Sequence, residues 1–257
     1  GRWKEALDLI DAMKSGGPQM QPSKIVYTAA IAACGRSGKH VEAMKLFRDM
    51  QGQGLQPDRV AYNSLLSALR VAGAADEAYS LWEEMCQKEE LRQAALPGRK
   101  SSFGPDLITV TEVVWALMTD ETNLAKADHV FEDAVKRGIV LHGNLDSGSE
   151  VDLSGMSWQV SRAACRYLIR RFRDEMRAGS RDTPPEIVLI TGIGNNNNNN
   201  NNNNSTRRQI LRDHVQTVLR TDFDPPIDSF VPERAQGTVH VSKEACERWV
   251  HAQTAKV

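Results

Sequence analysis

Residues 24–58 read KIVYTAAIAACGRSGKHVEAMKLFRDMQGQGLQPD, and the residues from 59 onward repeat this pattern at an offset of 35. Identical positions include Tyr27 and Tyr62, Gly38 and Gly73, Glu42-Ala43 and Glu77-Ala78, Leu46 and Leu81, and Met50 and Met85. A fixed period of about 20 to 50 residues indicates supersecondary units of one kind, stacked on each other.

Each copy of the pattern reads as two helices joined by a glycine. In the first copy, small and apolar residues over 26–33 follow helical spacing, and Gly38 interrupts them. A second apolar stripe covers 41–50 and is followed by Gly54. One such hairpin cannot bury its own apolar face, so the sequence predicts an α-solenoid in which neighbouring hairpins cover each other.

The recurring residues also match a known family. They are Val-Tyr-Thr over 26–28, Glu-Ala-Met-Lys-Leu-Phe-Arg-Asp-Met over 42–50 and Gly-Leu-Gln-Pro-Asp over 54–58. This pattern closely resembles the pentatricopeptide repeat (PPR) family. The tetratricopeptide pattern has nearly the same length, but its Trp, Leu-Gly and Tyr signature is missing. The resemblance covers about residues 1–137 and implies helix-turn-helix repeats that bind single-stranded RNA.

The predicted repeat array divides into four segments. Residues 1–23 hold only the second helix of a unit, so we expect further repeats upstream. Residues 24–58 and 59–106 are full repeats, and 107–137 is a degenerate repeat. The second full repeat carries thirteen extra residues after Met85. They read either as a tolerated surface insertion or as a basic finger that touches RNA backbone.

Beyond residue 137 the pattern changes. Residues 138–150 are rich in Gly, Asp, Ser and Asn and indicate a linker. Short apolar segments then alternate with amphipathic helical segments, which predicts an α/β two-layer domain over 151–257. We expect strands over 151–153, 186–191, 229–232 and 238–241, and helices over 157–177, 206–220 and 243–252.

Two motifs in this second domain resemble the small MutS-related (SMR) domain, which follows PPR arrays in a class of plastid and mitochondrial proteins. Asp152-Leu153-Ser154-Gly155 stands where that family has Leu-Asp-x-His-Gly, and Thr191-Gly192-Ile193-Gly194 matches its Thr-Gly-x-Gly. The resemblance implies a location in the chloroplast or mitochondrion and a role in RNA processing, stability or expression.

The first SMR motif contains the candidate catalytic residue. Some members of the family nick nucleic acids and others only bind them, and the carboxylate tied to cutting aligns with Asp152. The family histidine aligns with Ser154, which at neutral pH cannot act as a base or a cation. The enzyme question therefore stays open between an endonuclease, which would use Mg²⁺, and a binding domain in which Asp152 caps a turn at a strand end.

The second SMR motif precedes a loop that departs from the family. Gly192 and Gly194 follow a buried strand, so they either let backbone approach a phosphate or only form a tight turn. A run of ten asparagines over 195–204 comes next, and we expect it to be disordered because no packed core can use it. Arg207 and Arg208 then stand at a helix start, where they are candidate phosphate contacts.

Five arginines of the expected helix over 157–177 step by four, four, three and four residues, which places them on one helix face. A solvated face and a track for RNA phosphates both fit this pattern. The residues are Arg162, Arg166, Arg170, Arg173 and Arg177.

The PPR resemblance also implies base-recognition residues. In that family the residue after the Tyr position and the residue after the terminal Pro read one base. These are Thr28 with Asp58 and Asn63 with Asp106, which by the family's code favour guanine and then uracil; the third repeat offers Thr111. Short polar side chains can hydrogen-bond the edge of an unstacked base. The alternative is that they are ordinary helix caps and exposed residues.

The two family resemblances imply two classes of function, and composition is compatible with both. The 32 Lys+Arg against 33 Asp+Glu mean that any nucleic-acid surface must be local. The four scattered cysteines predict neither disulfides nor a metal site, no cofactor motif is present, and no apolar run reaches the ~20 residues that span a membrane. One interpretation is an organellar single-stranded RNA-binding protein whose SMR domain adds nucleic-acid binding or nicks nucleic acid. The other interpretation is a protein-interaction scaffold with an inactive SMR domain.

Overall fold

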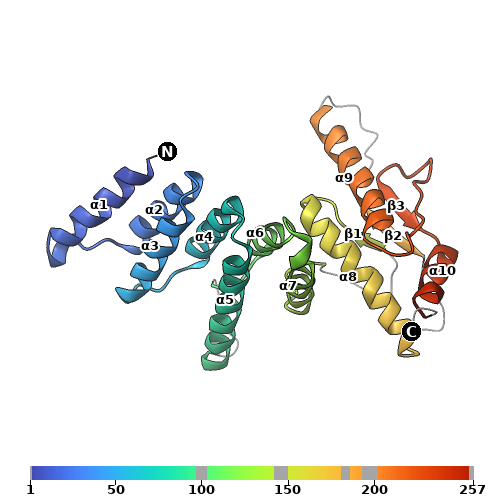
Figure 1. Ribbon diagram of the computed structural model, residues 1–257, viewed down its shortest axis with the longest axis horizontal. Coiled ribbons are helices and arrows are strands. Elements are labelled where there is room, and N and C mark those ends of the chain that lie inside the picture. The colour runs from blue at the N-terminus through green and yellow to red at the C-terminus, as the bar shows by residue number, and fades with distance from the viewer. Residues whose placement is uncertain (1, 97–102, 142–149, 181–185, 193–201, 255–257) are drawn as a thin grey trace. The chain divides into compact units, whose positions relative to one another are not determined.

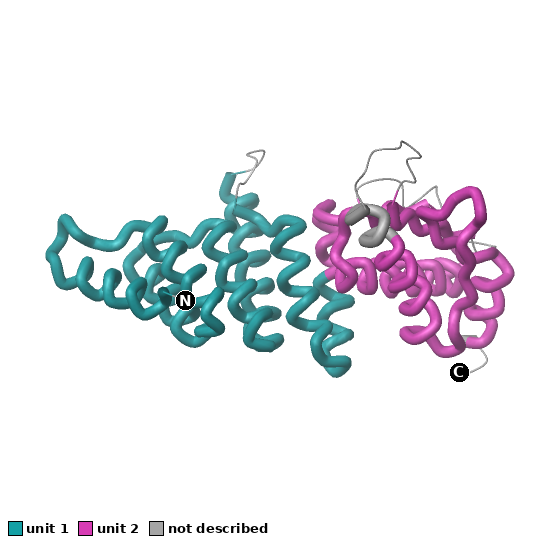
Figure 2. Tube along the Cα trace, turned by 90° about the horizontal axis from the view of Figure 1, so that it is seen from above, with its two compact units in different colours: residues 1–130 teal, residues 131–257 magenta. Residues whose placement is uncertain are grey.

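The computed structural model describes residues 2–96, 103–141, 150–180, 186–192 and 202–254, the last range without the side chains of 202–208 and 253–254. The chain forms two compact units, Gly1–Val130 and Phe131–Val257 (Figure 2).

Unit 1 is a stack of helical hairpins, as the repeat pattern predicts (Figure 1). Helices α2, α4 and α6 contact one another in sequence, and α3 and α5 pack behind them. We call α2, α4 and α6 the front helices. The elements are α1 (Trp3–Ser15), the short η1 (Pro18–Met20), α2 (Lys24–Arg36), α3 (His40–Gly52), α4 (Arg59–Ala72), α5 (Ala75–Ala95), α6 (Leu107–Leu117), the short η2 (Glu121–Asn123) and the first half of α7 (Leu124–Lys136).

The turns and starts of the repeats follow from their glycine and cap residues. Gly38 and Gly73 adopt φ values of +68° and +70°, a region that favours glycine, and they separate the two helices of each hairpin. Asp58 is the N-cap of α4 and accepts a hydrogen bond from the Ala61 N–H at 3.0 Å. The extra residues of the second repeat lengthen α5 to 21 residues, against 13 in α3.

The core of unit 1 is built from the residues that recur at the period of 35. Tyr27, Phe47 and Tyr62 are completely buried, and the rings of Phe47 and Tyr62 meet edge to face at 4.9 Å. This contact joins one hairpin to the next. Burial of these recurring core residues therefore stabilises the stack of hairpins as well as each single hairpin.

The buried tyrosines place their hydroxyls on carboxylates of the second helices. The Tyr62 hydroxyl donates to Glu84 Oε1 at 2.9 Å, and the same carboxylate accepts from Arg48, Gln51 and Lys88 at 2.8 to 2.9 Å. Burial of Glu84 opposes its charge, but these four donors outweigh that effect and lower its pKa from 4.5 to about 2. Because Arg48 and Gln51 belong to α3, the carboxylate also ties one repeat to the next.

The preceding repeat has the same arrangement. The Tyr27 hydroxyl donates to Asp49 Oδ2 at 2.6 Å, and Lys14 of α1 forms an ion pair with that carboxylate. Burial raises the pKa of Tyr27, and the hydrogen bond to Asp49 adds to the effect. A tyrosine–carboxylate–cation set is thus repeated along the array.

Unit 2 contains a three-stranded sheet and helices, with the second half of α7. The order is β1-β2-β3, with β1 parallel to β2 and β3 antiparallel to β2. Val151, Leu189 and Val239 are buried, so the sheet has one well-covered face. The elements are β1 (Glu150–Asp152), α8 (Trp158–Arg177), β2 (Ile187–Ile190), α9 (Asn202–Thr221), β3 (Thr238–Val241) and α10 (Lys243–Thr254).

One expected strand is wrong. Residues 229–232 form a single bridge, between Phe230 and His240, and no strand. Pro232 has no N–H to give to a ladder, which ends the pairing after one residue. α9 begins at Asn202, inside the asparagine run and before the expected start at 206. The rest of that run, 195–201, lies outside the described residues.

The boundary between the units lies inside α7, at residue 130, whereas the sequence places the end of the array at 137. From residue 131 onward α7 belongs to unit 2, where the ring centroids of Phe131 and of Tyr167 in α8 lie 5.7 Å apart. Most of the predicted linker over 138–150, namely 142–149, lies outside the described residues. Among the helices described, none has the length and apolar character needed to cross a membrane.

The Glu84 cluster predicts a pH dependence. Because the folded-state pKa lies below the ordinary value, the cluster stabilises the fold fully above pH 4.5, and this contribution is lost as pH falls through about 2. Glu84→Gln should lower the free energy of unfolding at pH 7 by about 1–2 kcal/mol and flatten its pH profile in that window. Glu83→Gln, at an exposed neighbour, is the control. Urea unfolding at several pH values measures both, and equal effects would contradict the assignment.

Candidate nucleic-acid interface

The first predicted recognition residue of each repeat occupies the same place in the structure. Thr28, Asn63 and Thr111 are each the fifth residue of their helix, in α2, α4 and α6. All three side chains are half-buried. Because the front helices stack in sequence, these residues form a series along one side of unit 1, as the recognition hypothesis requires.

In the second repeat the two predicted recognition residues are in direct contact. Asn63 Nδ2 donates to Asp106 Oδ1 at 3.3 Å, although 43 residues separate them. The N–H and hydroxyl of Thr109 also contact this carboxylate oxygen at 2.9 Å, and Arg59 lies 3.5 Å from the other oxygen. Burial opposes the charge of Asp106, but the hydrogen bonds from Thr109 and Asn63 and the charge of Arg59 together lower its pKa.

In the first repeat, Lys24 contacts both members of the corresponding pair, Thr28 and Asp58. The Thr28 hydroxyl donates to the carbonyl of Lys24 at 2.9 Å, and Lys24 Nζ lies 3.1 Å from Asp58 Oδ2. Burial opposes the charge of Asp58, but the Ala61 N–H and Lys24 together lower its pKa. Lys24 and Arg59 are each the first residue of a front helix, so the ion pair to the next cap carboxylate recurs at the repeat period.

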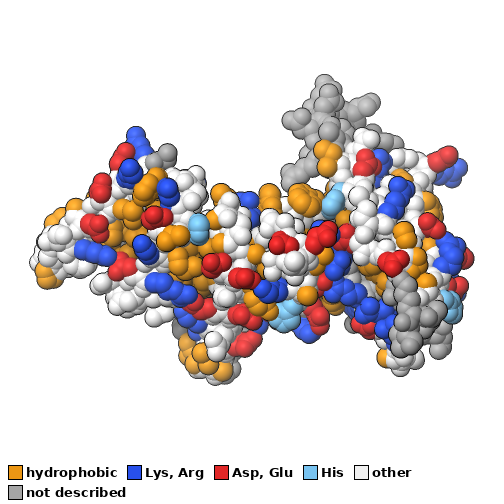
Figure 3. Space-filling model, in the orientation of Figure 1, with side chains coloured by type: hydrophobic (Ala, Val, Ile, Leu, Met, Phe, Trp, Pro, Cys, Tyr) orange, Lys and Arg blue, Asp and Glu red, His pale blue; other side chains and the backbone are white. Residues whose placement is uncertain are grey.

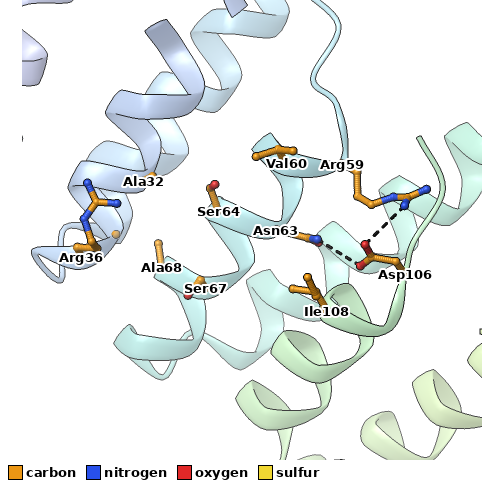
Figure 4. A pocket seen from close by; sticks show the side chains of 11 residues that line it. Ala32, Arg36, Arg59, Val60, Asn63, Ser64, Ser67, Ala68, Asp106 and Ile108 are labelled. Atoms are coloured by element: carbon orange, nitrogen blue, oxygen red, sulfur yellow. Dashed lines mark hydrogen bonds and ion pairs between the residues drawn. The ribbon is translucent and has the colours of Figure 1, made fainter. Parts of the chain in front are cut away.

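A groove of about 420 Å³ lies between α2 and α4 and reaches the start of α6 (Figure 4). Asn63, Arg59 and Asp106 form one side of it, and Arg36 of α2 stands at the other. Its floor is narrow because α2 and α4 approach closely: a Cβ on Gly35 would lie 2.9 Å from the Cβ of Ala68. The hydroxyls of Ser64 and Ser67 line the groove, and neither has a hydrogen-bond partner within the described part of the chain.

The sequence reasoning missed two features of this surface. Ile25, Val60 and Ile108, the second residues of the front helices, expose 77%, 62% and 59% of their surface. Arg36 is exposed beside the groove, and the described residues give it no partner. A branched apolar residue recurs two positions after Ser23, Asp58 and Asp106, directly after the first helical residue in each case, and this recurrence is the signal that would have found the first feature.

Charge is distributed evenly over the visible face of unit 1. Lys and Arg alternate with Asp and Glu there, and neither sign forms an extended patch (Figure 3). The groove on the front helices is likewise lined by hydroxyls, an amide, a carboxylate and two cations, a mixture that suits hydrogen bonding to bases better than purely electrostatic binding.

In unit 2, Asp152 is exposed at the end of β1. Its Oδ1 accepts the Ser154 N–H at 2.7 Å, which is the turn-capping geometry that the sequence left open. Ser154 is exposed as well. Among the described residues, no group of three or more His, Cys, Asp or Glu is arranged to hold a metal ion. The catalytic role of Asp152 stays a prediction.

The Thr-Gly turn after β2 is bonded within the protein. The N–H groups of Thr191 and Gly192 both donate to the carbonyl of Gly237, at 2.8 and 3.1 Å, and the Thr191 hydroxyl donates to it at 3.1 Å. These two N–H groups hold the start of β3, and in this conformation they are not directed to a phosphate. Gly194 and the side chains of Arg207 and Arg208 lie outside the described residues.

In the first half of α8 the predicted arginine face is paired within the protein, so it is neither fully solvated nor open to RNA phosphates. Arg162 makes a bidentate contact with Asp222, at 2.6 and 3.0 Å, and Arg166 reaches the same carboxylate at 3.3 Å. The Asp222 side chain is only 4% exposed. Arg173 pairs with Asp174 at 2.8 Å, Arg170 is half-buried, and Arg177 is exposed at the helix end.

The stacked hairpins with equivalent front positions define unit 1 as a helical-repeat fold. A family model described as "PPR repeat family" matches residues 22–71, and one described as "PPR repeat" matches residues 60–89. Residues 22–89 are therefore PPR repeats, as the sequence predicted. The assignment of unit 2 to the SMR domain stays a prediction.

Two solved structures are similar to the chain. The crystal structure of the pentatricopeptide repeat protein PPR10 from maize has 18% identity and a TM-score of 0.46, over 85% of this chain and 25% of that protein. A cysteine-substituted PPR10 in complex with an 18-nt PSAJ RNA element has 18% identity and a TM-score of 0.44, over 86% of this chain and 25% of that one. The chain thus spans about a quarter of their length. A comparison with curated proteins found no significant match.

The Asp222 cluster gives a testable prediction for unit 2. Asp222→Ala should lower the free energy of unfolding by roughly 3–5 kcal/mol, because it leaves two half-buried guanidinium groups without their shared carboxylate. Asp228→Ala is the matched control, since Asp228 pairs with Arg248 but is 82% exposed, and its loss should cost at most about 1 kcal/mol. Thermal and urea unfolding measure both. Equal effects of the two variants would show that the buried pairing is not a main source of stability.

Proposed function

We propose that the protein binds single-stranded RNA along the front helices of unit 1, with one base facing each repeat. The match of residues 22–89 to PPR repeats supports this proposal. The observation that carries it is the contact between Asn63 and Asp106, because two residues predicted to read one base meet beside a groove large enough for a nucleotide.

The surface supplies the contacts that an unstacked base needs. Amide, hydroxyl and carboxylate groups hydrogen-bond the base edge, and the exposed Val60 and Ile108 offer apolar surface on either side of Asn63 for the base faces. Arg36 and Arg59 supply positive charge near the sugar–phosphate backbone. The preference implied by the residue pairs is guanine followed by uracil.

The wider role that we propose is organellar RNA processing, stability or expression, in the chloroplast or mitochondrion. Unit 2, as an SMR-like domain, adds nucleic-acid binding or nicking. Unit 2 also supports the alternative of a scaffold with an inactive SMR domain, because Asp152 caps a turn and Arg162 and Arg166 already share a protein carboxylate.

RNA binding is tested with the full chain and labelled oligoadenylate that carries a central G-U step. We expect the affinity to fall as ionic strength rises, because counterions are released from the RNA on binding. Asn63→Ala should weaken binding by roughly tenfold, a typical value for one base contact. Fluorescence anisotropy at several salt concentrations measures both effects.

Glu83→Gln, which changes an exposed residue of α5, is the control for the RNA experiment and should bind as the unchanged chain does. Absence of binding to every G-U oligonucleotide would contradict the proposed function and favour the scaffold. Binding without any effect of Asn63→Ala would retain RNA binding but remove the predicted base readout.

Nicking is tested by incubating the full chain with single-stranded RNA and Mg²⁺, beside Asp152→Ala. If Asp152 is catalytic, the variant should lose cleavage by about a hundredfold or more, as expected when an essential acid or base is removed. The products are resolved on a denaturing gel. Equal cleavage by both proteins would remove Asp152 from the mechanism, and no cleavage by either would leave unit 2 a binding domain.

A further inference from the structure

Beneath the recognition pair of the second repeat lies a buried hydroxyl. Thr109 is completely buried, so it cannot touch RNA, yet it contacts both Asn63 and Asp106. We propose that Thr109 is a positioning residue that sets the base preference of the second repeat by fixing the orientation of the Asn63 amide. This inference rests on the proposed RNA-binding function and deepens it.

The three side chains form a closed set of hydrogen bonds. The Thr109 hydroxyl accepts the Asp106 N–H at 3.0 Å and lies 2.7 Å from Asn63 Oδ1. Asp106 Oδ1 in turn accepts the Thr109 N–H at 2.9 Å and the Asn63 Nδ2–H at 3.3 Å. The hydroxyl also lies 2.9 Å from Asp106 Oδ1, but it has a single proton. Asp106 Oδ1 already accepts two N–H groups, so donation of this proton to Asn63 Oδ1, at the shorter distance, satisfies every group in the set.

The reverse orientation of the amide is disfavoured. Turning Asn63 would bring its oxygen against Asp106 Oδ1, so that two acceptors would face each other, and would leave its nitrogen against the hydroxyl. In the observed orientation, the second N–H of Asn63 Nδ2 and the remaining lone pair of Asn63 Oδ1 are left to bind a ligand. A fixed donor beside a fixed acceptor can select among bases, whereas an amide that turns freely presents both patterns.

The first repeat lacks this device. Ala61 stands at the corresponding place after Asp58 and has no hydroxyl, and Thr28 bonds back to its own helix. The arrangement also involves more than helix capping, because Thr109 reaches across from α6 to a side chain of α4. We therefore expect the second repeat to discriminate bases through a residue that lies outside its own 59–106 segment.

The experiment measures the affinity of the full chain for four oligoadenylate RNAs that carry GU, GC, GA or GG at the centre. Three variants are compared. Thr109→Val keeps the shape of the side chain but removes the hydroxyl, Thr109→Ser keeps the hydroxyl, and Thr109→Ala removes the hydroxyl and the methyl group. Thr119→Val is the matched control, because among the described residues its hydroxyl bonds to the Ala116 carbonyl alone, at the end of α6 away from Asn63. Thermal unfolding of each variant is recorded alongside.

We expect Thr109→Val and Thr109→Ala to reduce the discrimination among the four RNAs by roughly tenfold, while Thr109→Ser and Thr119→Val retain it. If the unchanged chain discriminates and Thr109→Val does so equally, the proposal is overturned and the proposed function stands. If the unchanged chain binds none of the RNAs, the proposed function itself fails. Should both hydroxyl-free variants fail to fold, the hydroxyl is structural and the positioning role is rejected.

Discussion

Neighbouring front helices are joined by one ion pair, which recurs from the first repeat to the second. A cation at the first residue of one front helix binds the carboxylate that caps the next, as Lys24 does with Asp58 and Arg59 with Asp106. The carboxylate satisfies N–H groups that a helix start leaves without partners and at the same time joins two repeats. Because the same carboxylates are the predicted recognition residues, the proposed base reading would use atoms that also pack unit 1.

Unit 2 uses its charges differently. Its arginines lie at the helical spacing that a phosphate track would need, but the first two turn to a buried carboxylate on the segment after α9. A buried aspartate that binds two guanidinium groups keeps them ordered, while their charge is partly cancelled. The mixed surface of unit 1 and the neutralised helix of unit 2 both agree with the almost balanced charge of the chain.

Much of this fold could be predicted from the sequence because its signals are local. The period of 35, the glycine turns and the aspartate caps each depend on a few neighbouring residues, and all of them appear in the structure. The partner of Arg162 could not be predicted, since Asp222 lies 60 residues away and no periodicity connects them. Likewise, Asn63 and Asp106 could be named as a pair only through the family resemblance, and Thr109 had no sequence signal.

The lengthened second repeat shows how the array tolerates extra chain. After α5 ends at Ala95, the chain returns at Phe103, whose ring meets Tyr62 edge to face at 5.4 Å, and the next carbonyl, of Gly104, accepts from Arg59 at 2.6 Å. These contacts, and not the number of intervening residues, fix where α6 begins. Doubling the length of a closed loop costs only about 0.6 kcal/mol. The point between α5 and Phe103 is therefore a natural site for grafting an epitope or a fluorescent reporter, because the spacing from one predicted recognition position to the next would be preserved.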